Sequence, residues 1–398
     1  MITRRHLLQA LPSLPFIGGF FGSPVAAPPP AYRDFYAELG LRTFINAAGT
    51  LTFLSGSLMR NEVAQAMEYA RHHYVRLDDI EDRVGERIAS LLGCEAAVVT
   101  AGAASAMTLG TAGVLTGMDE EKVVQLPDVT GMKRQVIVQK AHRVSYLHAI
   151  RNTGVDLVFV ETRRELEAAI NDETAMLLFI NAYNFDGEVR DEEFASIGKK
   201  HGIPTFNDCA ADVPPVENLW RHTDLGFDLV AFSGGKGIRG PQSAGLLLGR
   251  KALIAAARLH MPPRGDTLGR GMKVNKEEVL GMLVALECYV ATDHEKEWDL
   301  WESQIRLIEA SVAAVPGTLP EYHVPPVANH VPTLRISWDA MRIPITPDDV
   351  RTRLRLGHPS IEVGGDGNAL NVATWMMRPG EERIVASRIS EILKESSS

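Results

Sequence analysis

A single lysine, Lys236, lies in a glycine-rich loop directly after an apolar run that predicts a buried strand. The loop belongs to the segment DLVAFSGGKGIRGPQSAGLLLG, residues 228–249. In a dry site, or near other positive charge, a lysine loses proton affinity, and its amine then acts as a nucleophile and a base. Taken by itself, the residue also fits an exposed hairpin lysine.

The lysine loop formally contains a G-x-G-x-x-G pattern at residues 235–240. In a dinucleotide site this pattern opens a helix and is followed about 20 residues later by an acidic residue. Here Pro241 and a second apolar run follow, so the segment is strand, loop, strand. A phosphate-binding P-loop is excluded as well, because no Gly-Lys-Ser/Thr closes the segment.

Polar and small residues follow several other predicted strands. The strand at 96–100 leads into small residues that open a helix, whose free N–H groups and dipole suit a phosphate. Sites in open parallel sheets lie beyond the carboxyl ends of the strands, so we expect these positions to converge. The candidates are Gly102, Ala103, Ser105, His142, Asn184, Asp208 and Ser233.

A phosphate cradle, a strand-end carboxylate and a loop lysine are what pyridoxal 5'-phosphate (PLP) requires. Lys236 would form the Schiff base, and Asp208 would keep the pyridine nitrogen protonated, which makes the ring an electron sink. Each residue also has a structural alternative. Asp208 fits a helix N-cap, His142 a core or surface residue, and Asn184 a turn at residues 184–187.

The elements that position these residues alternate between helical and strand-like patterns. Apolar residues recur at helical spacing in 61–75 and 80–93, and short apolar runs occupy 96–100, 134–139, 155–160, 174–181, 202–208, 228–233 and 244–249. Strands that are apolar throughout predict an α/β fold with a mostly parallel sheet and helices on both faces.

Changes in the sequence pattern along the chain predict its division into domains. Residues 1–30 resemble a secretory signal, 31–60 an N-terminal arm, and 61–275 a large PLP-binding domain. Longer helices and a short α+β pattern predict a smaller C-terminal domain at 276–398.

The chain resembles fold-type-I PLP enzymes of the class V aminotransferase type. The resemblance rests on the order of the candidates above and covers roughly residues 35–395. Within that superfamily it is most similar to bacterial selenocysteine synthase and to its relatives, the D-glucosaminate-6-phosphate ammonia-lyases. FINAAGTLTFLSGSLM resembles their active-site arm, CEAAVVTAGAASAM their phosphate loop, and the Lys236 segment their lysine loop.

The resemblance implies a role for each matching position. Lys236 is the Schiff-base lysine, Asp208 the partner of the ring nitrogen, His142 a stacking residue and Asn184 a ligand of the ring hydroxyl. Gly102, Ala103 and Ser233 would hold the phosphate, and Ser105 is a further candidate for binding the cofactor. The chain departs from the selenium transferase pattern at 53–57 and at Gly235, and it lacks a counterpart of that enzyme's tRNA-binding domain.

The composition of the chain limits the kinds of molecule that it is expected to bind. The 398 residues carry a net charge of −9 without a basic block, so a small amino substrate is expected and nucleic acid is not. Arg335 and Arg355 are candidates for binding a substrate carboxylate. The acidic run at 78–82 is interpreted as a solvated helix start, and no metal-ligand spacing appears. The 3 cysteines lie far apart and predict no disulfide framework.

The first thirty residues combine Arg4-Arg5, an apolar middle and Val25-Ala26-Ala27 before a proline run. This layout resembles a twin-arginine export leader and predicts a periplasmic or otherwise exported protein. A cytoplasmic protein whose N-terminus carries a chance arginine pair is the alternative. The apolar part is too short for a membrane span, so none is expected after signal removal.

We expect a PLP-dependent lyase that deprotonates Cα of an amino acid or amino sugar acid and eliminates a β-substituent, leaving a keto acid and ammonia. An aminotransferase or racemase would use the same residues. A non-catalytic exported ligand-binding protein is an alternative of another class. Because active sites of this superfamily usually lie at a dimer interface, at least a homodimer is expected.

Overall fold

The structure is a computed structural model that describes residues 33–397. The predicted export signal at 1–30 lies outside the described residues. Of the described residues, 33–43 belong to one unit and 44–397 to another. In the first, helix α1 (Phe35–Glu38) is capped by Asp34, whose side chain accepts a hydrogen bond from the Ala37 N–H.

The larger sheet has seven strands in the order β2-β8-β7-β6-β5-β3-β4. Only β8 runs antiparallel to its neighbours, and the other strand pairs are parallel. The strands are β2 (Ala96–Thr100), β3 (Gln135–Gln139), β4 (Asp156–Val160), β5 (Thr174–Ile180), β6 (Thr205–Asp208), β7 (Leu229–Ser233) and β8 (Gly245–Gly249). The mostly parallel sheet predicted from the apolar runs is therefore confirmed.

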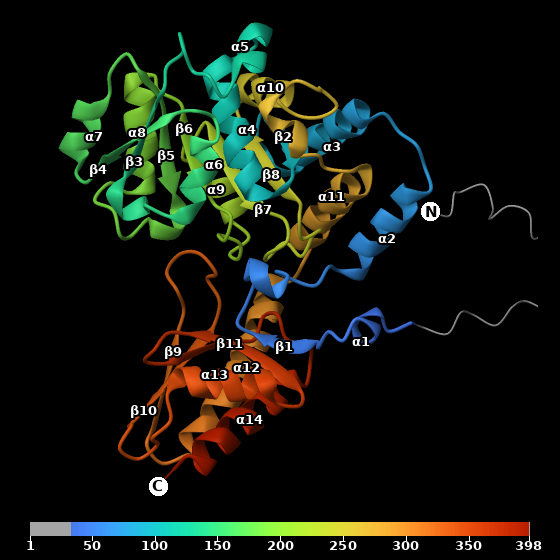
Figure 1. Cartoon of the computed structure of the whole chain (residues 1–398), viewed down its shortest axis with the longest axis vertical. Helices are drawn as coiled ribbons and strands as arrows, with labels where there is room; N and C mark the ends of the chain where they lie inside the picture. The colour runs from blue at the N-terminus through green and yellow to red at the C-terminus, as the bar shows by residue number, and fades with distance from the viewer. Residues whose placement is uncertain (1–32, 398) are drawn as a thin grey trace, which may run out of the picture. The chain divides into compact units, whose positions relative to one another are not determined.

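Helices cover both faces of this sheet (Figure 1). Successive residues of one strand show this directly, because Leu246 and Leu248 of β8 pack into one core while Leu247 packs into the other. One core includes α2 (Asn61–Arg71), α3 (Leu77–Leu92), α7 (Arg163–Ala169), α8 (Asp191–His201), α9 (Asn218–Asp224) and α11 (Lys276–Val290). The other includes α4 (Gly102–Thr116), α6 (His148–Arg151) and α10 (Lys251–Leu259), and α5 (Glu120–Gln125) follows α4. Burial on both faces explains why the strands are apolar throughout.

A second sheet has five strands in the order β1-β11-β12-β10-β9. The strands are β1 (Phe44–Ala47), β9 (Thr318–His323), β10 (Thr333–Trp338), β11 (Ser360–Gly365) and β12 (Leu370–Ala373). Helices α12 (His294–Ala313), α13 (Pro347–Leu356) and α14 (Glu381–Glu395) lie with it in the lower half of Figure 1. Their apolar faces share one core with this sheet.

Strand β1 comes from the segment that the sequence assigned to an N-terminal arm. It pairs in parallel with β11, with Ile45 opposite Ile361, so the first residues of the larger unit belong to the C-terminal sheet. Residues 48–60 then pass to the larger sheet, where the Ser57 N–H donates to the Gly235 carbonyl at 3.0 Å. The predicted boundaries at 60 and 275 stay predictions, because the described residues 44–397 belong to one compact unit.

Candidate active site

A cavity of about 630 Å³ lies beyond the carboxyl ends of the parallel strands. Its lining comes from the arm at residues 50–56, from the start of α4, and from the loops after β3, β5, β6 and β7. Five residues proposed from the sequence meet there: Gly102, Ala103, Asp208, Ser233 and Lys236. Their convergence follows from the topology, since parallel strands end at one edge of the sheet.

The Lys236 loop is held by close backbone approaches that only glycine allows. A Cβ on Gly235 would lie 2.5 Å from the Gln242 Cα, and one on Gly237 would lie 2.1 Å from the Val213 carbonyl oxygen. A hydrogen bond from the Gly240 N–H to the Gly234 carbonyl, 2.8 Å long, closes the loop. The glycines flanking the lysine therefore fix the path of the backbone and aim one side chain at the cavity.

The lysine and the two carboxyl groups in the cavity wall influence one another. Burial lowers the pKa of Lys236, while Asp208 and Asp212 act in the opposite direction. Burial likewise raises the pKa of Asp208, against a 3.0 Å hydrogen bond from the Ala210 N–H and the charge of Lys236. Each group is thus held away from its charged form by the dry surroundings.

The start of α4 offers a site for an anion. Gly102 adopts a φ of +84°, and the N-cap residue Ala101 supplies no side-chain acceptor to the first turn. The helix runs for 15 residues, so its dipole and free N–H groups face the cavity at this end. A Cβ on Gly245 would lie 2.6 Å from the Gly102 carbonyl carbon, so β8 and the helix start meet in close contact.

Three residues predicted for the site do not line the cavity. The His142 ring is fully buried, where its Nδ1 accepts the Ile180 N–H at 3.1 Å and its edge meets Phe179. The side chain of Asn184 accepts the Asp191 N–H at 3.2 Å. The Ser105 hydroxyl donates to the Ala101 carbonyl at 2.8 Å. Each side chain turns into the protein because it satisfies a buried backbone group there.

The two arginines predicted for a substrate carboxylate lie away from the cavity, one on the C-terminal sheet and the other on a helix that packs with it. Arg335 on β10 pairs with Asp366 at 3.3 Å. Arg355 at the end of α13 pairs with Glu362 at 2.7 Å. Neither lines the cavity, and both are already paired with acidic neighbours.

The cavity instead contains Arg143, which sequence reasoning missed. It directly follows His142 in the loop after β3. Its guanidinium lies 5.2 Å from the centre of the Phe159 ring, a contact that orients the planar group. Other lining residues outside the predicted set are Thr50, Ser145, Tyr146, Tyr183, Asp212, Gln242 and Ser243.

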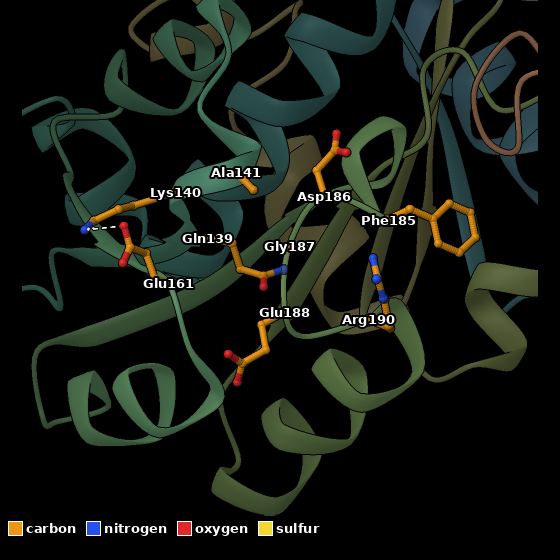
Figure 2. Close-up of a pocket in the computed structure, with 9 residues that line it drawn as sticks. All are labelled: Gln139, Lys140, Ala141, Glu161, Phe185, Asp186, Gly187, Glu188 and Arg190. Carbon is orange, nitrogen blue, oxygen red and sulfur yellow. Dashed lines mark hydrogen bonds and ion pairs between the residues drawn. The ribbon is translucent and has the colours of Figure 1, made fainter.

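A second cavity, of about 470 Å³, is lined by residues 139–141, by Glu161 and by the loop at 185–190. We call it the outer cavity. Figure 2 shows Gln139 beside Gly187 and the ion pair of Lys140 with Glu161 at its rim. The Gln139 amide donates to the Val189 carbonyl at 2.8 Å and accepts the Val189 N–H at 2.9 Å. These bonds tie the loop to β3, so this cavity is walled by a firmly attached segment.

Residues 33–397 contain neither a metal-binding cluster nor a membrane-spanning helix. No group of three or more His, Cys, Asp or Glu side chains is placed to hold a metal ion. No helix in that range combines the length and the apolar character that a membrane crossing needs. Cys94, Cys209 and Cys288 are free thiols.

The residues in the wall of the larger cavity fit the parts of PLP. The Lys236 amine, with its lowered proton affinity, can react with the aldehyde of PLP. The start of α4, which has small residues and free N–H groups, can bind the phosphate. The carboxyl of Asp208 is buried with its pKa raised, so a cation such as a protonated ring nitrogen would restore its charged form.

Solved structures identify the fold class. The chain is similar to a D-glucosaminate-6-phosphate ammonia-lyase structure at 27% identity and a TM-score of 0.80, over 92% of this chain and 100% of that chain. It shares its fold with a serine palmitoyltransferase from S. paucimobilis solved with a PLP compound, at 13% identity and a TM-score of 0.59, over 89% and 88% of the two chains. The predicted fold-type-I architecture of PLP enzymes is confirmed.

Sequence comparisons identify the family. Residues 44–315 match the model "SelA: L-seryl-tRNA selenium transferase", and the chain belongs to that family. It is 28% identical to a D-glucosaminate-6-phosphate ammonia lyase of Salmonella typhimurium, over 91% of this chain and 99% of that protein. It is 27% identical to a 5'-C-glycyluridine monooxygenase-decarboxylase of Streptomyces sp, over 90% and 92%.

The match to a selenium transferase itself is shorter. It has 29% identity to the L-seryl-tRNA(Sec) selenium transferase of Serratia proteamaculans, over 52% of this chain and 45% of that protein. The resemblance inferred from the lysine loop is thus confirmed, and the relatives are enzymes.

Proposed function

We propose that the chain is a PLP-dependent lyase that removes the Cα proton of an amino acid or amino sugar acid and eliminates a β-hydroxyl, releasing a keto acid and ammonia. The observation that carries this proposal is the meeting of Lys236 and Asp208 in one cavity, each with its pKa shifted by burial. The similarity to a D-glucosaminate-6-phosphate ammonia lyase along nearly the whole chain supports the same reaction class.

Named residues would hold the cofactor. Lys236 would be its covalent attachment point, and Asp208 would pair with the ring nitrogen. The phosphate would take the N–H groups at the start of α4, at Gly102 and Ala103, together with the Ser233 hydroxyl. When bound, PLP supplies a carbonyl that captures the substrate amine and a ring that withdraws electrons from Cα.

The chain's own groups would then perform the proton transfers. Lys236, an amine of lowered pKa, would accept the Cα proton of the bound substrate. Asp208 favours this step because its negative charge stabilises positive charge on the ring nitrogen. The buried surroundings keep water from competing for either proton.

Arg143 would bind an anionic group of the substrate. A planar guanidinium binds a carboxylate or phosphate through two parallel hydrogen bonds. Arg143 lines the cavity. This assignment replaces Arg335 and Arg355, which are engaged with Asp366 and Glu362.

The chain would act as a homodimer. Large apolar side chains are exposed on the arm and beside the cavity: Phe53 is 78% exposed, Leu58 64% and Tyr146 61%. An exposed apolar area around a site favours burial against a second copy. Light scattering should give about twice the chain mass of 43.5 kDa, and a monomeric mass would contradict the proposal.

The Arg4-Arg5 leader predicted from the sequence would direct export of the chain. Replacing both arginines by lysine should retain the protein in the cytoplasm. Equal amounts of wild type and variant outside the cytoplasm would refute this proposal.

The lyase is tested by product analysis. Wild-type protein purified with PLP should show an absorbance band near the visible edge, and Lys236→Ala should lose it. With D- and L-serine and amino sugar acids, wild type should release ammonia and a keto acid without an added amino acceptor. Product formation that needs a keto acid acceptor would instead indicate an aminotransferase, and stereochemical inversion alone a racemase. Protein that takes up no PLP would refute the enzymatic proposal.

A further inference from the structure

A second carboxyl group, that of Asp212, lines the cavity together with Lys236. It lies four residues after Asp208, in the loop that follows β6, and only 1% of the residue is exposed. One of its oxygens, Oδ1, accepts the Ala328 N–H at 3.2 Å. The other, Oδ2, is buried and has no partner within strict hydrogen-bond geometry among the described residues, and its polar neighbour is the Asn181 side chain, which lowers the pKa of the carboxyl. A buried carboxyl oxygen without a well-formed hydrogen bond needs an explanation, because it costs free energy in the folded protein.

The loop between β9 and β10 holds Asp212 in place from the C-terminal sheet. Ala328 and Asn329 both adopt left-handed backbone conformations, with φ of 47° and 48°. This conformation presents the Ala328 N–H to Asp212 and the Asn329 N–H to the Ala211 carbonyl, the latter at 2.7 Å. Non-glycine residues rarely adopt such angles, so these two residues hold an unusual backbone conformation in the loop that hydrogen-bonds to the Asp212 carboxyl.

The charge environment of Asp212 favours a group that can give up a proton near neutral pH. Burial raises its pKa to about 6; Asp208 acts in the same direction, whereas Asn181, the Ala328 N–H and Lys236 act against it. A carboxyl with this proton affinity exists in both forms under ordinary conditions, as a general acid must. The neighbouring Asp208 already accepts a hydrogen bond from the Ala210 N–H, and Lys236 is the proposed acceptor of the Cα proton. Asp212 therefore remains as the group that can donate a proton.

We propose that Asp212 is the general acid that protonates the departing β-oxygen of the substrate. The inference rests on the proposed elimination and adds the second proton transfer that it requires. The Cα–H bond breaks, its proton goes to the Lys236 amine and its electron pair forms the Cα=Cβ bond. The Cβ–O bond breaks, its electron pair stays on oxygen, and the Asp212 carboxyl donates the proton that makes water. The unsaturated amine released then takes up water and yields the keto acid and ammonia.

The leaving group distinguishes this role from a structural one. Chloride departs as an anion without a proton, whereas hydroxide is a poor leaving group until it is protonated. In Asp212→Asn we expect elimination of water from serine to fall by roughly 10²-fold or more, and elimination of chloride from β-chloroalanine to change less than about threefold. Exchange of the serine Cα proton with deuterium from solvent should continue in the variant, because Lys236 is intact.

Two further variants make the test specific. Asp212→Glu keeps a carboxylic acid and should recover part of the serine reaction. Asp191→Asn removes another buried carboxyl, one that pairs with Arg221 and lies outside the cavity, and should leave the ratio of the two substrates unchanged. Equal losses on serine and β-chloroalanine in Asp212→Asn would overturn the inference. A wild-type protein that eliminates from neither substrate would instead count against the proposed function.

A measurement without cofactor or turnover tests the same carboxyl. Carbon-13 spectra of the cofactor-free chain, labelled at its aspartate carboxyls, should contain one resonance that titrates near pH 6 and disappears in Asp212→Asn. The same resonance should remain in Asp191→Asn. If the Asp212 resonance titrates near pH 4, the side chain is an ordinary carboxylate at working pH and the acid role fails.

Discussion

Lys140 and Lys236 both follow strands of the seven-stranded sheet at the same edge, β3 in one case and β7 in the other. Lys140 is exposed at the rim of the outer cavity and pairs with Glu161 at 2.9 Å, which raises its pKa (Figure 2). Lys236 is largely buried in the wall of the inner cavity, and burial lowers its pKa. Two lysines at equivalent ends of strands are thus shifted in opposite directions.

The carboxyl partners show the same contrast. Glu161 is exposed and its negative charge is hydrated, so it simply holds Lys140 as an ammonium ion. Asp208 and Asp212 are buried, and burial raises the pKa of both. In the exposed ion pair at the rim, each group keeps its charged form. In the buried wall, desolvation shifts the pKa values of the same kinds of group toward neutral pH, so that they can transfer protons. Burial, rather than the number of charges, separates the reactive cavity from the outer one.

The largest effect is expected from the lysines themselves. Lys236→Ala removes the base and the attachment point of the cofactor, and the rate of elimination should fall at least ~10³-fold. Lys140→Ala should change it less than about twofold, because that side chain faces water. Steady-state release of ammonia measures both. A large loss in Lys140→Ala would mean that the outer cavity takes part in the reaction.

A smaller effect is expected from Asp208. Asp208→Asn keeps the shape of the side chain but removes the charge that would stabilise a protonated ring nitrogen, so the rate should fall by about 10²-fold. The absorbance band of the bound cofactor should also shift in its pH dependence. Glu161→Gln, the same kind of change at the rim, serves as the control and should leave the band unaltered. An unchanged rate in Asp208→Asn would remove Asp208 from the mechanism.

The reactive half of this comparison could be predicted from the sequence. The runs AAVVT and DLVAFS became β2 and β7 nearly residue for residue, because a strand covered on both faces must be apolar throughout. Lys236 and Asp208 could be placed at one edge because parallel strands share a direction. Glycines at 234, 235 and 237 indicated a loop whose backbone approaches its neighbours closely.

The remaining residues depend on details that periodicity does not encode. His142 and Asn184 were found at the correct strand ends, but short turns rotate their side chains toward buried N–H groups. Asp212 was missed because it is held by the N–H of Ala328, which lies more than a hundred residues away in the loop between β9 and β10. Strand β1 was assigned to an arm because its partner, β11, lies at the other end of the chain.

The next effect is on stability and follows from the raised pKa of Asp212. A folded-state pKa of about 6 against an ordinary value of 3.8 means that the folded chain favours the protonated form. The favourable contribution of protonated Asp212 to the free energy of unfolding is fully present below pH 3.8 and is lost as the pH rises through about 6. Wild-type cofactor-free protein should therefore lose up to about 3 kcal/mol relative to Asp212→Asn over that window.

Chemical unfolding of the wild type and of Asp212→Asn at a series of pH values measures the difference. Asp208 is present in both proteins, so the difference between them reports Asp212 together with its coupling to Asp208. A constant gap between wild type and Asp212→Asn from pH 4 to pH 7 would contradict the burial argument for this carboxyl.

The smallest effect is expected from breaking the exposed pair at the outer cavity. Glu161→Gln removes the charge that holds Lys140, but both side chains remain hydrated and the loop at 185–190 stays attached through Gln139. The melting temperature should change by less than about 2 °C, and elimination should stay within about twofold of the wild-type rate. In contrast, Gln139→Ala removes both bonds to Val189 and should lower the melting temperature clearly, because a buried backbone N–H and carbonyl lose their partners. Equal effects of the two substitutions would mean that the ion pair, rather than the buried amide, holds the wall of the outer cavity.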